Sequence, residues 1–514
     1  MALKVGGTEV ISNSRQLSNI ASVDATTVAA LGTAGVGGGG GEFDAVASGN
    51  ISNGDLVVLN SNGTVSTHQG FMSDKTDLGT TDTQKISAVF DSSNNKIVVA
   101  YDDNTTGKGM AVVGTVSNNA ITFGTPVEWL STQPNYTTCL FDSNSNKIVI
   151  GYTGVNSYVY AVVGTVSGTS ISFGSNTTIY GASAAWLAGC FDSNVNKCAF
   201  FFRNTNNQGA GIVATVSGTS LTSGSVVQME ETGQTFNINN TGANFDSNNN
   251  KCLVAFRHAT DSNKGYSIVA TVASSGNSLS FGQPVKFYDN TVSECEVGFD
   301  SNVNKSVITW RDANVDNKIR AAVTSISGTV PSYGTTAIVD NFAAGGISNN
   351  RRMAFDSNLN KLVFVFLRAG SDNDKRVTLG TISGTDITFS TPQVFDTSAQ
   401  NDATIAFDSN ANQSVIFYNS NATGSRIGSG KVVFGDYGES FFNWVGITQA
   451  AISNGATGTI TVLGGVSENQ SGLTVGSAHY LKDDGTFSTT AASGREVGKA
   501  ISATKMLLTS ATIT

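Results

Sequence analysis

The sequence predicts an all-β protein: a seven-bladed β-propeller inserted into a small β-sandwich or barrel domain, preceded by an extended N-terminal arm. The main observation is a phrase that reads Phe-Asp-Ser-Asn-x-Asn-Lys in most of its seven copies. The copies open at Phe90, Phe141, Phe191, Phe245, Phe299, Phe355 and Phe407. Their Asp residues follow one another at intervals of 51, 50, 54, 54, 56 and 52 residues. A period of this length, filled with β-type sequence, indicates a propeller.

The second observation is that each copy carries four predicted strands. In the second copy these strands are 137–141, 148–152, 160–166 and a run that begins at 171, all short, rich in β-branched and aromatic residues, and bounded by Gly, Asn and Ser. Several strands are apolar on both faces, as expected of strands that lie between two neighbouring sheets. Four antiparallel strands in each of seven units favour a propeller. A solenoid is the alternative, although its repeats are usually shorter.

Composition restricts the classes of function. Of the 514 residues, 13% are charged, 57 are Gly, and the net charge is −9 without any run of Lys or Arg. Nucleic-acid binding through phosphate contacts is therefore not expected. The five cysteines are 139, 190, 198, 252 and 295. Their odd number and the absence of Cys-x-x-Cys argue against a disulfide framework or a zinc site. Cys198 and Cys252 each follow their turn Asp by six residues and are interpreted as small core residues.

The N-terminal 44 residues are expected to form an arm that ends in a glycine linker, 37–41. The arm has too few apolar residues to bury a core, so we expect it to dock on another chain or another copy of itself. The sequence begins without a basic and apolar signal segment, and no stretch is long and apolar enough to span a membrane. Synthesis in a cytoplasm and no membrane insertion are the expectations.

The propeller is expected at 75–437, and the small discontinuous β domain at 45–74 plus 438–514. Residues 54–66 read as a hairpin with an Asn-Gly turn, and a similar phrase recurs at 478–488. The seventh repeat lacks its fourth strand, so we expect residues near 66–80 to supply it and close the ring. Both chain connections would then leave from the face that carries the Asp-Ser-Asn turns.

The repeats differ in a way that distinguishes the two faces of the propeller. The Asp-Ser-Asn turn and the Ser-Gly-Thr turn after the third strand hardly change, and they share one face, which we call the turn face. The loops after the second strand and between blades share the opposite face, the loop face, and differ in every repeat. A fixed scaffold with varied loops is typical of a binding surface. The alternative is that these loops vary because nothing constrains them.

Four arginines are candidate receptor-binding residues on the loop face. Arg203, Arg257 and Arg311 follow their turn Asp by eleven residues, and Arg368 follows its turn Asp by twelve. Together with Trp186 and Trp129 they would suit a carboxylated or phosphorylated glycan, because guanidinium binds such groups bidentately. The alternative is that these arginines form salt bridges with loop acids such as Asp261, Asp312 and Asp316.

Metal binding and catalysis have weaker support. The Asp-x-Asn-x-Asn turns resemble the start of a calcium loop but lack its glycine and its final glutamate, and Asx turns need the same residues. No cofactor is expected. The three His residues are 68, 258 and 479, and no nucleophile motif surrounds any of them. A glycan-cleaving propeller remains an alternative, with paired carboxylates drawn from Glu128, Glu230, Glu231, Glu294 and Glu296.

The two ends of the chain and the repeat text carry a resemblance. The opening Val-Ile-Ser-Asn-Ser-Arg-Gln-Leu-Ser-Asn-Ile at 10–20, the repeat ending Gly-Thr-Val-Ser-Gly-Thr-Ser-Ile-Ser-Phe-Gly and the phrase at 455–466 resemble tail-fibre-like proteins of marine tailed bacteriophages, including cyanophages. The resemblance implies a fibre, spike or knob on the virion surface, commonly homotrimeric, with the arm as the attachment end. Its partners would be other virion proteins and a host-surface glycan or protein.

From these observations we expect a non-enzymatic virion appendage whose loop face attaches to a host. The alternatives are the glycan-cleaving propeller described above and a purely structural decoration of the head or tail.

Overall fold

A computed structural model describes residues 3–5, 8–11, 41–60, 62–67, 72–79, 82–231, 234–341, 344–345, 353–368, 374–397, 402–421, 426–433, 444–481, 487–489 and 496–509. The chain divides into two compact units, 72–438 and 1–71 with 439–514. The boundaries expected from the sequence were 75–437 and 45–74 with 438–514. Within the described ranges the structure is almost entirely β, with one short 3-10 turn at Val155–Ser157. None of the helical structure described there has the length and hydropathy needed to cross a membrane.

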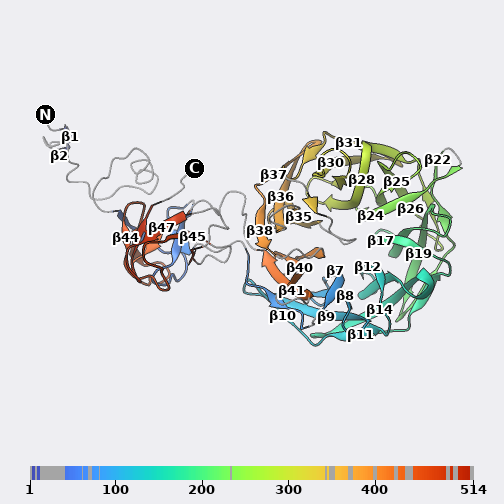
Figure 1. The fold of residues 1–514 in the computed structure, drawn as a ribbon, viewed down its shortest axis with the longest axis horizontal. Coiled ribbons are helices and arrows are strands. Elements are labelled where there is room, and N and C mark those ends of the chain that lie inside the picture. The colour runs from blue at the N-terminus through green and yellow to red at the C-terminus, as the bar shows by residue number, and fades with distance from the viewer. Residues whose placement is uncertain are drawn as a thin grey trace. The chain divides into compact units, whose positions relative to one another are not determined.

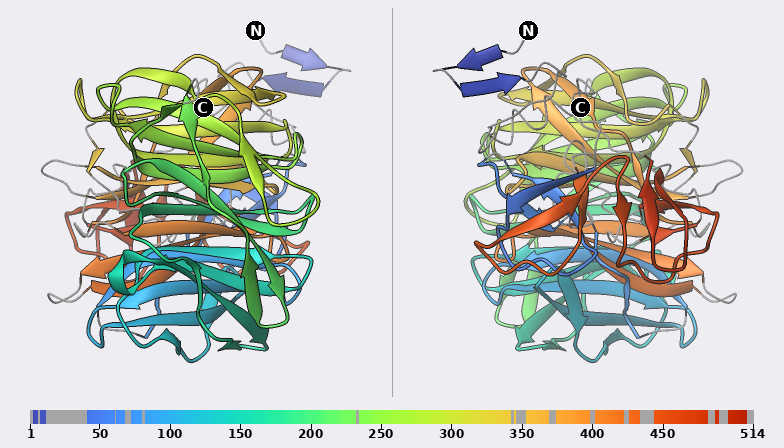
Figure 2. Two further views of the ribbon diagram at one scale, coloured as in Figure 1. Left: turned by 90° about the vertical axis from the view of Figure 1, so that its right-hand side faces the viewer. Right: turned by 90° about the vertical axis from the view of Figure 1, so that its left-hand side faces the viewer.

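The larger unit is a seven-bladed β-propeller, as predicted (Figure 1). The first blade shows the common plan, in which three long strands run up, down and up and the third pairs with two short outer strands. These are β7 (Thr83–Asp91), β8 (Lys96–Asp103), β9 (Lys108–Ser117), β10 (Ala120–Phe123) and β11 (Val127–Leu130). In the side views of Figure 2 the strands run between the two faces of the propeller.

The second to fourth blades repeat this plan. The second contains β12 (Asn135–Asp142), β13 (Lys147–Thr153), β14 (Val159–Ser167), β15 (Ser170–Phe173) and β16 (Thr177–Tyr180). The third contains β17 (Ala185–Asp192), β18 (Lys197–Arg203), β19 (Gly209–Ser217), β20 (Ser220–Ser223) and β21 (Val227–Gln228). The fourth contains β24 (Ile238–Asp246), β25 (Lys251–His258), β26 (Lys264–Val272), β27 (Leu279–Phe281) and the first part of β28 (Val285–Asp300). A small hairpin, β22 (Glu230–Glu231) and β23 (Gln234–Thr235), lies between the third and fourth blades in sequence.

The last three blades complete the ring. The fifth contains the second part of β28 with β29 (Lys305–Asp312), β30 (Ile319–Ser327), β31 (Val330–Tyr333) and β32 (Ala337–Ile338). The sixth contains β33 (Ala344–Gly345), β34 (Met353–Asp356), β35 (Lys361–Arg368), β36 (Lys375–Ser383), β37 (Asp386–Phe389) and β38 (Gln393–Asp396). The seventh contains β39 (Ala403–Asp408), β40 (Gln413–Asn421), β41 (Arg426–Val433) and β6 (Thr76–Asp77).

The core of the propeller lies between blades. The first strands of successive blades contact one another in a closed circle, and β39 of the seventh blade contacts β7 of the first. The middle strands are apolar on both faces because each blade packs against two neighbours. In β18, Phe200 and Phe202 face the second blade while Phe201 faces the fourth, and all three are fully buried.

The outer strand is broken in two, which the sequence did not predict. The break follows a glycine such as Gly124, where an added Cβ would lie 1.9 Å from the carbonyl oxygen of Thr169 in the Ser-Gly-Thr turn of the next blade. Gly174 meets Thr219 in the same way, at 2.1 Å. The glycine at this position in blades one to five therefore lets one blade approach the backbone of the next.

The Asp-Ser-Asn phrases form Asx turns, which was one of the two alternatives left by the sequence. In the second blade, Asp142 Oδ1 accepts hydrogen bonds from the N–H groups of Asn144 and Ser145, both at 3.0 Å. All seven turn aspartates are at most 2% exposed. The last Asn of each turn has a positive φ, 54° at Asn146, a conformation that Asn tolerates better than most residues.

The predicted closure of the ring is confirmed. Strand β6 pairs with β41 through Asp77 and Ser429, and the N–H groups of Ser73 and Leu78 donate to the backbone of the same strand at 2.8 and 2.7 Å. Met72 forms a bridge with Val433, so both ends of the propeller lie on the turn face.

The smaller unit contains two five-stranded sheets. The first consists of β3 (Glu42–Val46), β43 (Thr457–Thr461), β42 (Trp444–Thr448), β4 (Leu56–Leu59) and β5 (Val65–Thr67), and the second of β44 (Val466–Ser467), β48 (Met506–Leu508), β47 (Glu496–Ala500), β45 (Ala478–Leu481) and β46 (Phe487–Ser488). The two predicted hairpins are the pairs β4–β5 and β45–β46. Glu42 already pairs in β3, so the ordered sheet begins before the expected end of the arm. Within the arm, β1 (Leu3–Val5) pairs with β2 (Thr8–Ile11), and 12–40 lie outside the described residues.

Candidate functional site

The first strands of blades one to five each begin, on the loop face, with a β-bulge. At every bulge one residue other than glycine has a positive φ, and it lies six positions before the turn Asp. These residues, which we call the bulge ring, are Lys85 (φ 50°), Tyr136 (46°), Trp186 (57°), Asn240 (51°) and Glu294 (56°). The left-handed conformation costs a residue with a side chain roughly 1–2 kcal/mol. Strain of this kind, repeated around the axis on five different side chains, is typical of a functional surface.

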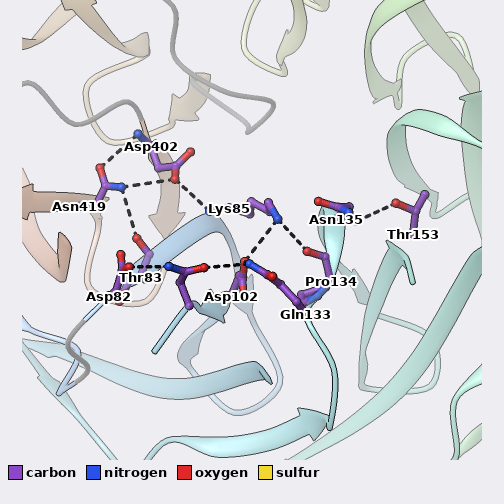
Figure 3. Close-up of polar contacts among 11 residues, drawn as sticks. Asp82, Thr83, Lys85, Asp102, Gln133, Pro134, Asn135, Thr153, Asp402 and Asn419 are labelled. Atoms are coloured by element: carbon purple, nitrogen blue, oxygen red, sulfur yellow. Dashed lines mark hydrogen bonds and ion pairs between the residues drawn. The ribbon is translucent and has the colours of Figure 1, made fainter. Parts of the chain in front are cut away.

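The bulge residue of the first blade connects three blades (Figure 3). The Lys85 N–H donates to Asp402 Oδ2 of the seventh blade at 3.0 Å. Lys85 Nζ donates to Asp102 Oδ2 at 3.3 Å and to the carbonyl oxygen of Pro134, before the second blade, at 3.0 Å. Gln133 Nε2 also donates to Asp102 Oδ2, at 2.9 Å. Burial raises the pKa of Asp102, whose side chain is fully buried.

The four predicted arginines fall into two classes. Arg311 Nη2 lies 3.2 Å from Glu294 Oε1, and Arg368 makes a bidentate ion pair with Asp340, 2.9 Å at its shortest. For these two residues the salt-bridge alternative is correct. The loop acids named for that role pair elsewhere: Asp312 and Asp316 with Arg320, and Asp261 with Lys264.

Arg203 and Arg257 form the second class, which has no carboxylate partner among the described residues. Arg203 Nη1 donates to Asn239 Oδ1 at 2.6 Å. Arg257 Nε is buried and is hydrogen-bonded to no group of the described protein. Burial lowers the pKa of Arg257, and the positive charge of Arg203 lowers it further. The two guanidinium groups are neighbours that have no counter-charge among the residues that the structure describes.

The two tryptophans also differ. Trp186 belongs to the bulge ring, and its ring centroid lies 5.4 Å from that of Tyr136. The prediction for Trp129 was wrong. Trp129 lies on the outer strand β11, is 4% exposed, donates from Nε1 to the carbonyl oxygen of Met110 and packs edge-on against Tyr152. It is a core residue between the first and second blades.

A polar cavity lies beside the bulge ring, among the first strands of blades one to five. It has room for about 30 Å³, enough for one or two water molecules or for a single polar group. Thr137, Asn240, Thr241, Glu294 and Glu296 are among its lining residues.

Several buried polar atoms in and around this cavity have no hydrogen bond to any protein group within the described ranges. They are Thr137 Oγ1, Asn240 Oδ1 and Thr241 Oγ1 in the lining, with Trp186 Nε1 and Arg257 Nε nearby. Buried polar atoms normally have a partner, so a polar ligand or solvent is needed to satisfy them here. Trp186 Nε1 and Arg257 Nε can only donate, the two threonine hydroxyls can donate or accept, and Asn240 Oδ1 can only accept. The two donors suit a ligand that carries acceptors, such as a carboxylate, sulfate, phosphate or hydroxyl.

The candidate acids of the enzyme alternative are spread over the loop face. Lys108 Nζ lies 2.7 Å from Glu128 Oε2, and His258 Nε2 lies 3.5 Å from Glu231 Oε2. Of the five glutamates named from the sequence, Glu294 and Glu296 line the cavity. In the part of the chain that the structure describes, no group of three or more His, Cys, Asp or Glu residues is placed to hold a metal ion.

The bulge residues Lys85, Tyr136, Asn240 and Glu294 were not singled out as a set from the sequence. The signal that would have found them is the alignment of the repeats on the turn Asp, because the position six residues earlier differs in each of blades one to five. The same position is Asp402 in the seventh blade and Asn350 in the sixth, and Asn350 lies outside the described residues.

The strand topology defines a seven-bladed β-propeller protein. Neither a protein-family model nor a curated protein sequence matches the chain. A sialidase from Trypanosoma rangeli is similar in structure with 12% identity and a TM-score of 0.40, and the match covers 70% of this chain but 59% of the sialidase. A protein from Lactobacillus plantarum has 12% identity and a TM-score of 0.44 over 67% of this chain and 96% of that protein. The intramolecular trans-sialidase from Ruminococcus gnavus has 8% identity and a TM-score of 0.39 over 70% and 96% of the two chains.

Proposed function

We propose that the loop face binds an anionic glycan at the bulge ring, and that the protein is a non-enzymatic virion appendage that uses this face for host attachment. The observation that carries the binding site is the pair Arg203 and Arg257, two neighbouring guanidinium groups for which the described residues supply no carboxylate partner. Arg203 lies close to Tyr136, whose ring packs against that of Trp186, and Arg257 lies close to Arg203.

The electrostatics of the pair favour an anionic ligand. The protein has a net charge of −9, yet these two half-buried cations are paired with no carboxylate in the described part of the chain, whereas Arg311 and Arg368 are paired. A carboxylate, sulfate or phosphate would neutralise them and accept charge-assisted hydrogen bonds. The faces of Tyr136 and Trp186 would supply apolar contact to the sugar ring.

The virion role is supported by the sequence resemblance of the arm, the repeats and the C-terminal phrase to tail-fibre-like phage proteins. In this proposal the arm and the small β unit attach to other virion proteins, and the protein assembles as a homotrimer on the virion surface. A ligand site with modest affinity is strengthened when several copies bind one cell surface together.

Binding of the purified protein to intact host-like cells tests the proposal. An Arg203→Ala/Arg257→Ala variant removes both unpaired cations, and Lys305→Ala removes a cation that bonds Ser325 at the turn-face end of the fifth blade. We expect wild type and Lys305→Ala to bind and the double variant, folded by circular dichroism, to lose binding at least tenfold. Equal binding by the double variant would contradict this site, and no binding by wild type to any cell tested would favour a structural decoration.

Glycan cleavage is the second candidate function, and Asp102 is the observation that favours it. Burial raises the pKa of its carboxyl group, as also occurs at catalytic acids. Lys85 Nζ donates to this carboxyl group, and the backbone N–H of Lys85 donates to a second carboxylate, Asp402. Release of reducing ends from anionic polysaccharides by wild type, reduced at least a hundredfold in Asp102→Asn, would establish this function. Binding without release would support the non-enzymatic proposal.

A further inference from the structure

Cys190 and Cys252 face each other across the interface between the third and fourth blades. Their Sγ atoms lie 2.8 Å apart, and the two side chains are 1% and 0% exposed. Cys190 is on β17, the first strand of its blade, and Cys252 is on β25, the second strand of the next blade. These two strands are in contact. A disulfide bond has an S–S distance of about 2.05 Å, so the sulfurs need to approach by less than 1 Å.

The repeat explains why the two cysteines meet. The residue two positions before the turn Asp of one blade lies against the residue six positions after the turn Asp of the next blade. The pairs at these positions are Val89 with Ile148, Leu140 with Cys198, Cys190 with Cys252, Asn244 with Ser306, Gly298 with Leu362, Ala354 with Ser414, and Ala406 with Ile97. The pairs Leu140 with Cys198 and Ala406 with Ile97 each share an interblade core cluster, as Cys190 and Cys252 do. One interface of the seven has cysteine at both positions.

We infer that Cys190 and Cys252 form a disulfide that joins the third and fourth blades when the protein meets a small disulfide oxidant such as oxidised glutathione. In the first step one cysteine thiolate attacks the glutathione disulfide, forms a mixed disulfide and releases one reduced glutathione. In the second step the other thiolate displaces the second glutathione and forms the bond between the blades. The two thiols lose two protons and two electrons in all, and one oxidised glutathione becomes two reduced molecules.

The environment of the pair determines when the bond can form. The hydrogen bond with Cys190 and burial raise the pKa of the Cys252 thiol, so few thiolates exist in the folded protein at neutral pH. Glutathione is also too large to enter the interblade core. Oxidation is therefore expected during folding, before the third and fourth blades have packed, and to be slow in the protein already folded in reducing buffer.

The other cysteines provide internal controls. Cys198 occupies the same position in the third blade as Cys252 does in the fourth, but it faces Leu140 and therefore has no thiol opposite. Cys139 and Cys295 are buried in other interblade clusters. A bond that depends on the geometry of the interface should involve Cys190 and Cys252 alone.

Thiol counting by mass spectrometry tests the inference on the full-length chain. The protein is refolded from guanidinium either with reductant or with a mixture of reduced and oxidised glutathione, unfolded again and labelled with N-ethylmaleimide. All five cysteines should be labelled after reducing refolding. After oxidising refolding three of the five should be labelled, because the other two are bonded to each other. Peptide mapping of wild type should then recover a cross-linked peptide that contains Cys190 and Cys252.

Two variants and a melting curve complete the experiment. Cys198→Ala should still lose two labelling sites on oxidation, whereas Cys252→Ala should lose none. The oxidised wild type should melt roughly 5 °C above the reduced protein, because the bond closes a long loop. Labelling of all five cysteines after oxidising refolding, or a cross-link between any other pair, would overturn the inference.

Discussion

At the scale of single residues, the seven turn aspartates stabilise the propeller through their hydrogen bonds, while burial opposes the charged form of four of them. Each accepts two backbone N–H groups, yet each is buried. Burial raises the pKa of Asp192, Asp300, Asp356 and Asp408, although the backbone hydrogen bonds oppose the shift. A carboxylate whose pKa is raised by folding makes the folded state less stable as the pH rises from its unfolded pKa, about 3.9, through the raised value.

Asp300→Asn tests this balance, because the amide oxygen can still accept from Asn302 and Val303. We expect the variant to be more stable than wild type at pH 7 and to lose that advantage as the pH falls towards 4. Guanidinium unfolding at a series of pH values measures the difference.

Asp289→Asn provides a control of opposite sign. Asp289 is exposed, and hydrogen bonds from Lys286 and Lys264 lower its pKa, so its contribution is present at neutral pH and disappears in acid. The two variants should therefore diverge from wild type in opposite directions at pH 7. The same direction of change in both would contradict the assignment.

At the scale of elements, the sequence specified the strands and turns well and the bulges poorly. The Asp-Ser-Asn phrase predicts its own turn because Asp supplies the acceptor and Asn the left-handed residue. Nothing comparable marks the bulge ring, because Tyr136 and Trp186 ordinarily avoid a positive φ. The conformation there is imposed by the surrounding blades, and it became visible only in the structure.

Trp129 and Cys190 also show what could not be predicted from the sequence, each for a different reason. Trp129 was placed on the loop face by its proximity in sequence to an interblade loop, but its ring turns into the core from the outer strand. Cys252 was correctly interpreted as a core residue, yet its partner could not be predicted, because the facing positions belong to different strands of different repeats.

The bulge conformation itself can be tested at Asn240, which has φ 51° and an unbonded Oδ1. Asn240→Gly should be more stable than Asn240→Val by about 2 kcal/mol, because a β-branched residue is strained in the left-handed region and glycine is not. Thr222 is the control, because it pairs in register with Thr215 on an outer strand of the third blade and has no positive φ. There the order should reverse, with Val above Gly by about 1 kcal/mol. The same order at both positions would show that the bulge does not govern the choice of residue.

At the scale of the whole molecule, the propeller is closed by residues from its two ends. Leu78, next to β6, is 1% exposed and packs with Ile86, Phe417 and Val432 between the first and seventh blades. Unfolding of the propeller is therefore expected to become less cooperative when this closing contact is weakened. Leu78 is far in sequence from Phe417 and Val432, so the contact joins the two ends of the propeller.

Leu78→Ala should lower the free energy of unfolding by about 2–4 kcal/mol, since it removes a buried side chain from the closing interface. Val315→Ala, at a side chain 63% exposed on a loop of the fifth blade, should change it by less than about 0.5 kcal/mol. Guanidinium unfolding followed by tryptophan fluorescence measures both. Equal stability of the two variants would contradict the closure by β6.

The two faces of the propeller differ in what they carry. The turn face has nearly the same residues in every blade and carries both connections of the propeller. The loop face differs in every blade and carries the bulge ring, the polar cavity and the two arginines that have no carboxylate partner among the described residues. This asymmetry is the physical basis for placing a ligand on the loop face.

A glycan array is the measurement that tests this central claim most directly. Wild type, Arg203→Ala/Arg257→Ala and Lys305→Ala would be compared on matched carboxylated, sulfated, phosphorylated and neutral glycans at low and high salt. We predict that wild type and Lys305→Ala bind one class of anionic glycan, that salt weakens the binding, and that the double variant loses it. Binding that prefers neutral glycans, or that survives in the double variant, would contradict an anion site at the bulge ring.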